Sequence, residues 1–351
     1  MRKNEESKVH MADDTPLSPP TSIDVARRAG VSQSAVSLVL GGKAAGRVGK
    51  YTQEAILQAA RELGYRPNTA ARTLRSGRSR LIALAIPDVS NPYFAAVLQG
   101  AEQAARAHGY FVMLAQVRDE QDWQYMILDV LSSRAVDGFL FCEVQPPTTN
   151  EYMALHGKVV TVNVGSQTFP SLQLDMTAGM HAAMAHLLQL GHRKIAHLAA
   201  DVNTETFHLR HQAYLDELQR AGCSITSAYQ VHAPFTIPEA YQAAHYLLDA
   251  ADPPSAIICD SDVLAVGVYK AAKDLQRTIP QDVSVASFDD SLIARILEPA
   301  LTTIAIPASV IGEQAVLLLL DVLAERHVPA QMTVPLELVV RASTTVVNVG
   351  K

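Results

Sequence analysis

From Leu81 onward, short apolar runs alternate with longer amphipathic segments. The first series of apolar runs covers residues 81–87, 110–115, 138–142 and 158–164, and the second covers 193–199, 256–259 and 283–288. This alternation is typical of βαβ units and parallel sheets. The two series show no close sequence repeat, but each predicts a similar sheet, so we expect two doubly wound α/β lobes, with any ligand at the carboxyl ends of the strands.

The residues before Leu81 follow a helical pattern. Thr21 is suited to cap a first helix that ends at Gly30, and Ser32 is suited to cap a second one. Two short helices joined by a glycine-containing turn predict a helix-turn-helix, and a third amphipathic helix is expected from a cap at Thr52 to Gly64. A generic three-helix bundle is the alternative.

The second of these helices favours nucleic-acid binding over a plain bundle. Its first turns carry Gln33, Ser34 and Ser37, short polar side chains that fit a major groove and hydrogen-bond to base edges. Residues 21–80 hold 11 Lys/Arg against three acids, a net charge of +8, whereas residues 81–351 carry a net charge of −13. DNA phosphates therefore attract the first segment and repel the second.

Composition narrows the class of protein further. The chain has 351 residues, 48% of them hydrophobic and 18% charged, as in ordinary soluble globular proteins. It has no apolar run of about 18 residues, and its first twenty residues resemble a disordered leader, not a secretory signal. Cys142, Cys223 and Cys259 lie far apart and fit reduced thiols. We expect a cytoplasmic protein without a membrane segment.

Three runs carry a resemblance to a known family. TSIDVARRAGVSQSAVSLVLGGK, LGYRPNTAARTLRSGRS and LIALAIPDVSNPYF, in this order, resemble the LacI/GalR family of bacterial transcription regulators, and the resemblance covers Thr21 to Thr345. It implies an α/β fold: an N-terminal helix-turn-helix three-helix head plus a hinge helix, then two doubly wound α/β lobes of the periplasmic-binding-protein-like type. It also implies a homodimer that binds a pseudo-palindromic operator in double-stranded DNA.

The resemblance divides the chain as follows: a disordered leader (1–20), a helix-turn-helix DNA-binding domain (21–67), a hinge helix and linker (68–80), and an effector-binding and dimerisation core (81–345). Within the core, the N-lobe takes 81–163 and 306–329, and the C-lobe takes 164–305 and 330–345. The chain is expected to cross between lobes near Val164, Ile306 and Pro329.

The family's DNA-binding positions fall on residues of the head and the hinge, which are Thr21, Ser32, Gln33, Ser34, Ser37, Leu38, Asn68, Ala71, Leu74 and Arg75. Leu74 lies where the family inserts an apolar wedge into the minor groove, although an ordinary packing leucine is the alternative. At Leu38 the family commonly has an arginine, so the operator sequence does not follow from the resemblance.

The family's effector positions fall on Tyr93, Phe94, Arg210, Phe235 and Asp289. The alternatives are core aromatics and a surface ion pair that Arg210 and Asp289 form with each other or with neighbours. A guanidinium, a carboxylate and aromatic faces together suit a polyhydroxylated ring, so a sugar is the first expectation and a nucleobase or nucleoside the second. Asp262 matches a family position of a more structural kind, a helix cap.

We therefore expect a transcriptional repressor whose operator affinity is controlled by a small ligand. A solute-binding protein without a DNA role and an enzyme on a doubly wound fold are the rivals. No catalytic motif, cofactor fingerprint or metal-ligand spacing is present, so no catalytic residue, cofactor or metal is expected, and the histidines, among them His197 and His211, are expected at the surface or in packing. Helix 307–325 and the helix after Asn91 are candidates for the dimer face, unless the LLLL run is buried within a lobe.

Overall fold

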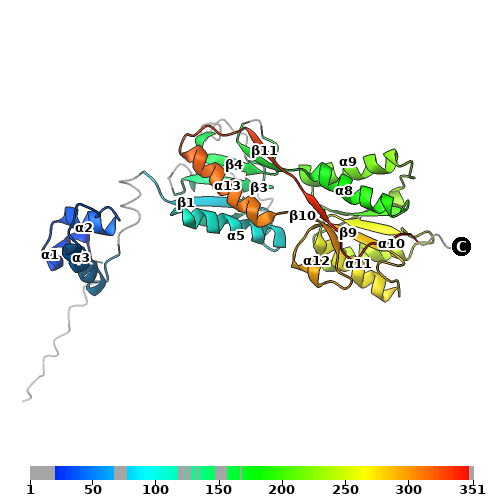
Figure 1. The fold of residues 1–351 in the computed structure, drawn as a ribbon, viewed down its shortest axis with the longest axis horizontal. Coiled ribbons are helices and arrows are strands. Elements are labelled where there is room, and N and C mark those ends of the chain that lie inside the picture. Colours follow the sequence, from blue (N-terminus) through cyan, green and yellow to red (C-terminus); the bar gives the residue numbers. More distant parts are fainter. Residues whose placement is uncertain are drawn as a thin grey trace, which may run out of the picture. The chain divides into compact units, whose positions relative to one another are not determined.

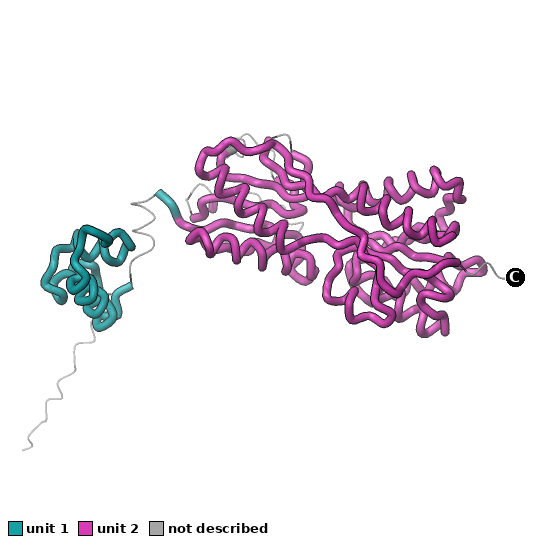
Figure 2. Tube along the Cα trace, in the orientation of Figure 1, with its two compact units in different colours: residues 1–78 teal, residues 79–351 magenta. Residues whose placement is uncertain are grey.

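A computed structural model describes residues 20–66, 77–117, 135–146, 156–166 and 168–347, together with isolated positions between 123 and 133. The chain forms two compact units, residues 1–78 and residues 79–351 (Figure 2). Residues 1–19 of the expected leader lie outside the described residues, as do the expected hinge positions Asn68, Ala71, Leu74 and Arg75.

The first unit contains the predicted three-helix head, α1 (Ser22–Ala29), α2 (Gln33–Leu40) and α3 (Lys50–Glu62). Thr21 and Asp24 form a capping box at the start of α1, and Gly30 ends the helix in the left-handed conformation at φ 66°. Val25, Val36 and Ile56, one from each helix, are fully buried and form the centre of a small apolar core.

The start of α3 differs from the prediction. The helix begins at Lys50 with Gly49 as its N-cap, so Thr52 lies in the first turn and does not cap it. The Gln53 backbone N–H donates to the Gly49 carbonyl, and the Gln53 side chain donates to the Val48 carbonyl at 2.7 Å. With these two hydrogen bonds in its first turn, the helix begins before Thr52, where the sequence analysis placed the cap.

The second unit contains two six-stranded sheets, one in each lobe (Figure 1). The N-lobe sheet has the order β11-β5-β4-β3-β1-β2, and its strands are β1 (Leu81–Ile86), β2 (Phe111–Gln116), β3 (Gly138–Cys142), β4 (Val159–Val162), β5 (Ser171–Leu174) and β11 (Gln331–Val334). The C-lobe sheet has the order β12-β10-β9-β8-β6-β7, and its strands are β6 (Ile195–Ala200), β7 (Gln230–Ala233), β8 (Ala256–Cys259), β9 (Ser284–Asp289), β10 (Thr302–Ala305) and β12 (Glu337–Val339). Neighbouring strands run parallel except β10 and β12, which confirms the doubly wound prediction.

Helices cover these sheets and complete the layers. The N-lobe has α5 (Pro92–Ala107), α13 (Ala308–Leu323) and the short η1 (His156–Lys158); the C-lobe has α8 (Met176–Gln189), α9 (Glu205–Arg220), α10 (Ile237–Leu248), α11 (Asp262–Asp274), α12 (Leu292–Ile296) and η2 (Ser227–Tyr229). In the C-lobe, α8 and α9 lie on one face of the sheet and α10 and α11 on the other (Figure 1). No helix of the described chain has the length and apolarity that a membrane crossing requires.

Two of the three lobe crossings lie later in the chain than the sequence analysis placed them. The strands β5 and β11 pair with each other in the N-lobe sheet, so the chain leaves that lobe at Asp175 and Pro335, not near Val164 and Pro329. Both strands have four residues, and β11 is largely exposed, so neither forms an apolar run in the sequence. The remaining crossing is at Ile306 and Pro307, between β10 and α13.

In the N-lobe, α5 and α13 cross at very short range. A Cβ added at Gly312 would lie 1.9 Å from the Val97 carbonyl oxygen, and one added at Gly100 would lie 1.8 Å from that of Ser309. Both helices therefore need a glycine at the crossing. Leu318 and Leu319 are buried in the same lobe, so two of the four residues of the LLLL run pack within it, whereas Leu317 is exposed.

We expect Gly312→Ala to lower the free energy of unfolding by about 2–3 kcal/mol, because the added methyl forces two packed backbones apart. Urea denaturation of the full chain measures this. Gly157→Ala is the control, since nothing lies within 4 Å of a Cβ there, and its effect should stay within about 0.5 kcal/mol. Equal effects of the two changes would contradict the close crossing.

Candidate functional site

A cavity of about 280 Å³ lies between the two lobes, at the carboxyl ends of the strands. Every ligand position predicted from the sequence lines it. The N-lobe contributes Pro87, Asp88, Asn91, Tyr93, Phe94 and Glu143; the C-lobe contributes Asp201, Val202, Thr204, Thr206, Phe207, Arg210, Pro234, Phe235, Asp260 and Asp289; and Ile306 lies at the crossing. The parallel strands of both sheets thus end at one shared cavity, as expected for such folds.

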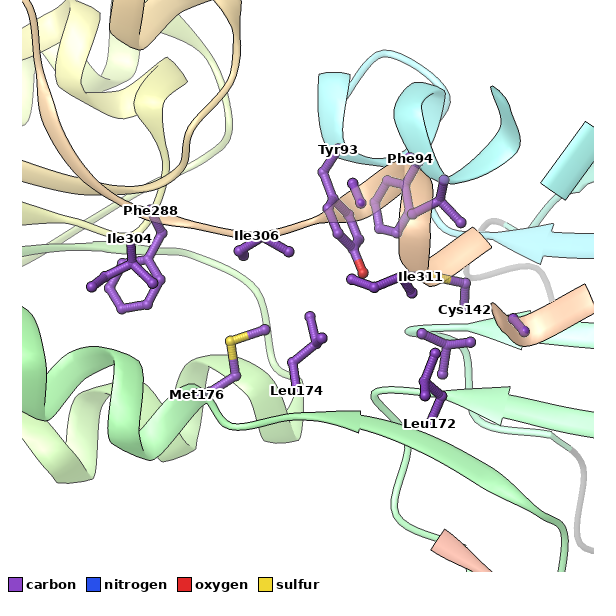
Figure 3. Packing of buried hydrophobic residues seen from close by; sticks show 14 of the residues in the cluster. Tyr93, Phe94, Cys142, Leu172, Leu174, Met176, Phe288, Ile304, Ile306 and Ile311 are labelled. Atoms are coloured by element: carbon purple, nitrogen blue, oxygen red, sulfur yellow. The ribbon is translucent and has the colours of Figure 1, made fainter. Parts of the chain in front are cut away.

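The N-lobe wall is aromatic. The Asn91 side chain accepts a hydrogen bond from the Tyr93 backbone N–H at 3.0 Å, and Pro92 starts α5, which places Tyr93 and Phe94 in the first turn. Their rings meet edge to face with centroids 5.0 Å apart (Figure 3). The Tyr93 hydroxyl is buried beside the Cys142 thiol, a weak partner, and makes no other contact of hydrogen-bond geometry within the described chain.

The C-lobe wall has its own aromatic pair. The rings of Phe207 and Phe235 lie with centroids 5.7 Å apart and a tilt of 56°. The sequence analysis selected Phe235 and missed Phe207, which lies one helical turn before Arg210 on α9. The spacing of three residues on a helix was the signal for Phe207, because it puts both side chains on one face.

Arg210 is a buried, fixed donor. Its Nη1 donates to the Asp260 carbonyl oxygen at 2.6 Å and its Nη2 to the Met176 sulfur at 3.3 Å. The guanidinium carbon lies 4.0 Å from the ring centroid of Phe288 and 5.3 Å from that of Phe207. The Nε–H is buried and has no hydrogen-bond partner among the described residues.

Asp289 is held at the end of β9 in an unusual backbone conformation, with φ 116°. Its Oδ2 accepts a hydrogen bond from the Ser261 hydroxyl at 2.7 Å. Burial, and next the charge of Asp262, raise the pKa of Asp289 to about 8, against the opposing effect of Arg210. No ion pair joins Arg210 to Asp289 within the described chain; Arg210 instead lies in a buried ion pair with its neighbour Asp260, with 3.9 Å between Nη1 and Oδ1.

The raised pKa of Asp289 has a consequence for stability. Between the ordinary pKa of 3.8 and about 8, the unfolded state ionises Asp289 while the folded state keeps it protonated, so the native state loses stability as pH rises through this window. Asp289→Asn removes the titration. We therefore compare the free energy of unfolding of Asp289→Asn with that of the wild type at each pH. The difference should move in favour of the variant by at least about 1 kcal/mol from pH 5 to pH 8. Asp249→Asn, at an exposed position, should show no such trend.

A half-buried carboxylate on the N-lobe side was missed. Glu143 follows β3 at φ 55°, and its Oε1 accepts a hydrogen bond from the Asn163 Nδ2 at 2.9 Å. Burial raises the pKa of Glu143, while Asn163, Arg210 and Thr206 act in the opposite direction. The position directly after a buried strand was the available signal. The same signal applies to Asp88, Asp201 and Asp260, which also follow strands and line the cavity.

Asp262 has the structural role that the sequence suggested, but not as a cap. It is the first residue of α11, and Ser261 is the N-cap. Its buried carboxylate accepts hydrogen bonds from Ser287, Ser291 and Thr303. These bonds join α11 to the ends of β9 and β10 behind the cavity, and Asp262 is not among the lining residues.

In the head, the predicted DNA contacts gather at the starts of α1 and α2. Thr21 and Ser32 are exposed N-caps, and Gln33 and Ser34 are exposed in the first turn of α2. Gln33 donates to the Ser22 hydroxyl at 2.9 Å, which joins the two helices. Ser37 and Leu38 follow on α2 and are half-buried.

Some basic side chains of the head form ion pairs with acids, and others are exposed to solvent. Arg27 and Arg28 form ion pairs with Asp24 and Glu62, at 3.2 and 2.7 Å. Lys43 and Arg47 are exposed on the segment that joins α2 to α3, and Lys50 is exposed at the start of α3. Exposed basic side chains suit DNA phosphates, and the exposed first turn of α2 suits a major groove. Within the described chain, no group of three or more His, Cys, Asp or Glu is arranged to hold a metal ion.

Both units of the chain match families of known proteins. Residues 23–68 match the family model described as bacterial regulatory proteins, lacI family, and residues 184–344 match a periplasmic binding protein-like domain. The structure is similar to the lac repressor dimer bound to operator and the anti-inducer ONPF, with a TM-score of 0.82 at 24% identity over 93% of this chain and all of that chain. It is also similar to the transcriptional regulator CelR–cellobiose complex, with a TM-score of 0.68 at 27% identity over 92% of this chain and 99% of that chain.

Curated relatives cover nearly the whole chain. The HTH-type transcriptional repressor CytR of Escherichia coli (strain K12) is 31% identical over 329 residues, which is 92% of this chain and 96% of CytR. The HTH-type transcriptional repressor PurR of Yersinia enterocolitica is 32% identical over 327 residues, 91% of this chain and 95% of PurR. With a helix-turn-helix head followed by a ligand-binding body, the chain belongs to the LacI family and is a DNA-binding transcriptional repressor.

Proposed function

We propose that a small neutral ring bearing several hydroxyl groups, with a sugar as the first candidate, binds in the cavity and controls the operator affinity of this repressor. The observation that carries the proposal is a set of buried polar atoms without strong partners on one cavity: the Arg210 Nε–H, the Thr204 hydroxyl and the Tyr93 hydroxyl. A buried polar group left unsatisfied costs about 1–3 kcal/mol, so a ligand that supplies partners is favoured.

The charge of the cavity supports a neutral ligand. Among the described residues, its lining holds five carboxyl groups and one guanidinium, that of Arg210; the carboxyl groups belong to Asp88, Glu143, Asp201, Asp260 and Asp289. An anionic ligand would meet the ionised carboxylates among them, whereas hydroxyl groups can donate to these carboxylates and accept from the protonated Asp289. The CelR–cellobiose complex, a structure of the same fold, contains such a neutral sugar.

A nucleoside is the second candidate, and the aromatic walls favour it. Tyr93 and Phe94 line the N-lobe side and Phe207 and Phe235 the C-lobe side, so a flat base can pack against rings from both lobes. Its ribose would offer the same hydroxyl groups as a sugar to the carboxyl groups.

A thermal-shift screen of the full chain separates these ligands. The panel contains free sugars including cellobiose, nucleosides, nucleobases, and the phosphorylated form of each sugar and nucleoside. A ligand at 100 times its Kd stabilises by about 2.7 kcal/mol, which is readily seen as a rise in Tm. We expect neutral members to raise the Tm and their phosphorylated forms to have little effect. Stabilisation by the phosphorylated forms alone would contradict the proposal.

We further propose that the repressor acts as a homodimer on a pseudo-palindromic operator, with Gln33, Ser34 and Ser37 reading bases. Apolar side chains exposed in both lobes support a dimer. Phe111 on the edge strand β2 is 66% exposed, and Leu292 on α12 is 73% exposed. Sedimentation velocity should show a dimer at the concentrations that bind DNA, and a monomer there would contradict the proposal.

Within this proposal the remaining DNA positions act around the base readers. Thr21, Ser32, Asn68 and Arg75 contact the backbone, Ala71 lies between paired hinge helices, and Leu74 enters the minor groove. Ligand binding changes the relation between the lobes and so changes whether two hinge segments can bind DNA together.

A further inference from the structure

Behind Arg210, a histidine and an aspartate form a pair that is shielded from solvent. His197 in β6 and Asp260 after β8 have side chains only 1% and 0% exposed, and His197 Nε2 lies 3.1 Å from Asp260 Oδ1. The other carboxylate oxygen accepts a hydrogen bond from the Ala200 backbone N–H at 2.9 Å. Because β6 and β8 are neighbours in the sheet, residues 63 positions apart meet here.

Asp260 is also the residue that holds Arg210. Its carbonyl oxygen accepts the 2.6 Å hydrogen bond from Arg210 Nη1, and its Oδ1 lies 3.9 Å from the same nitrogen. Burial acts to raise the pKa of Asp260, but His197, Arg210 and the Ala200 amide together hold this pKa below its ordinary value. The carboxylate is therefore ionised, and His197 and Arg210 share it from two sides.

A row of rings connects this pair to the protein surface. His197 Nδ1 lies 3.3 Å from His211 Nδ1, and the two rings stack with centroids 5.5 Å apart. The centroid of the exposed His232 lies 6.3 Å beyond His211. When His197 Nε2–H donates to Asp260, its Nδ1 accepts from His211, so the neutral pair shares one hydrogen. A second proton turns the pair into a cation beside Arg210.

We propose that His197 and Asp260 position Arg210 for the ligand, and that proton uptake by the His197–His211 pair weakens ligand binding. This inference rests on the proposed function of the cavity. A protonated pair competes with Arg210 for the charge of Asp260. It also adds a second cation next to a guanidinium that the ligand would remove from water.

The other groups facing the pair set the pH at which it titrates. His232 on β7 and His208 on α9 act to lower the pKa of His211, whereas Asp260 acts to raise it. Tyr214, whose ring lies 5.0 Å from that of His197, stays neutral because burial raises its pKa. Burial, His197 and His232 lower the pKa of His211. Proton uptake by the His197–His211 pair therefore takes place below the ordinary pKa of 6.5.

The binding test uses cellobiose and adenosine as probes on the full chain, with affinities measured by calorimetry at about pH 7.5 and about pH 5.5. We expect the probe that binds to lose about fivefold in affinity at the lower pH, the lower end of ordinary coupling between sites. His197→Gln keeps a donor for Asp260 but does not titrate, and should flatten this profile. His245→Gln on α10 is the matched control and should keep it.

A ligand-free arm keeps the inference separate from the identity of the ligand. The Nε–H resonance of Arg210, assigned by its loss in Arg210→Lys, should shift between the two pH values in the wild type and in His245→Gln. It should stay fixed in His211→Gln, whose half-buried site tolerates the change if His197→Gln fails to fold. A wild-type resonance that does not move, or one that moves equally in His211→Gln, would overturn the proposal even if neither probe binds.

Discussion

Arg210→Lys should weaken binding of the cavity ligand by at least about 100-fold, or about 2.7 kcal/mol, and leave operator affinity unchanged. A lysine ammonium cannot bond the Asp260 carbonyl, stack on Phe288 and present an Nε–H to a ligand at the same time. Calorimetry with the ligand found in the thermal-shift screen measures the loss, and fluorescence anisotropy on operator DNA measures the retained binding.

Arg220→Lys provides the matched control on the same helix. Arg220 lies in the last turn of α9 with its side chain 61% exposed, outside the cavity. The control should bind ligand like the wild type. A loss of ligand affinity of only about threefold in Arg210→Lys would correspond to less free energy than one hydrogen bond to a charged group contributes. Arg210 would then have no direct role in ligand binding.

The second large effect is expected for a substitution in the core of the three-helix head. Ile56→Ala removes a fully buried side chain from a core to which Val25 and Val36 are the other central contributors. Such truncations cost about 2–5 kcal/mol, which is comparable with the whole stability of a domain this small. Operator binding should therefore be lost, while ligand binding stays, because residues 79–351 form their own compact unit.

Leu57→Ala is the control that distinguishes loss of core packing from a general effect of truncating a side chain on α3. Leu57 is 42% exposed on the same helix, so this variant should retain operator binding within about threefold. Parallel loss of operator binding in both variants, or joint loss of ligand binding in Ile56→Ala, would show that the head does not depend on its own core in the way described.

The sequence was most informative where residue type and strand periodicity agree. Tyr93, Arg210 and Asp289 were assigned because their positions, at a strand end or on the helix that follows, match motifs of the resembled family, and all of them line one cavity. The head was predicted for a similar reason, since caps such as Thr21 and stops such as Gly30 act locally. Local signals of this kind need no knowledge of the tertiary structure.

What the sequence missed depends on contacts between distant segments. His197 lies in an apolar run and is read as a packing residue, and only the pairing of β6 with β8 places it against Asp260. The strands β5 and β11 escaped because they are short, and they are recognised as strands through their pairing with each other. Glu143 escaped because a single acid after a strand is common, and its burial becomes visible only when the second lobe covers it.

The central claim is that occupancy of the cavity controls operator affinity. We would select an operator from random duplex DNA with the full chain and measure its affinity by fluorescence anisotropy, with and without the ligand, for the wild type and Arg210→Lys. The account predicts a symmetric operator, a ligand-dependent change of at least about fivefold in the wild type, and no change in Arg210→Lys. An operator affinity that stays constant while the wild-type cavity is saturated with ligand would contradict it.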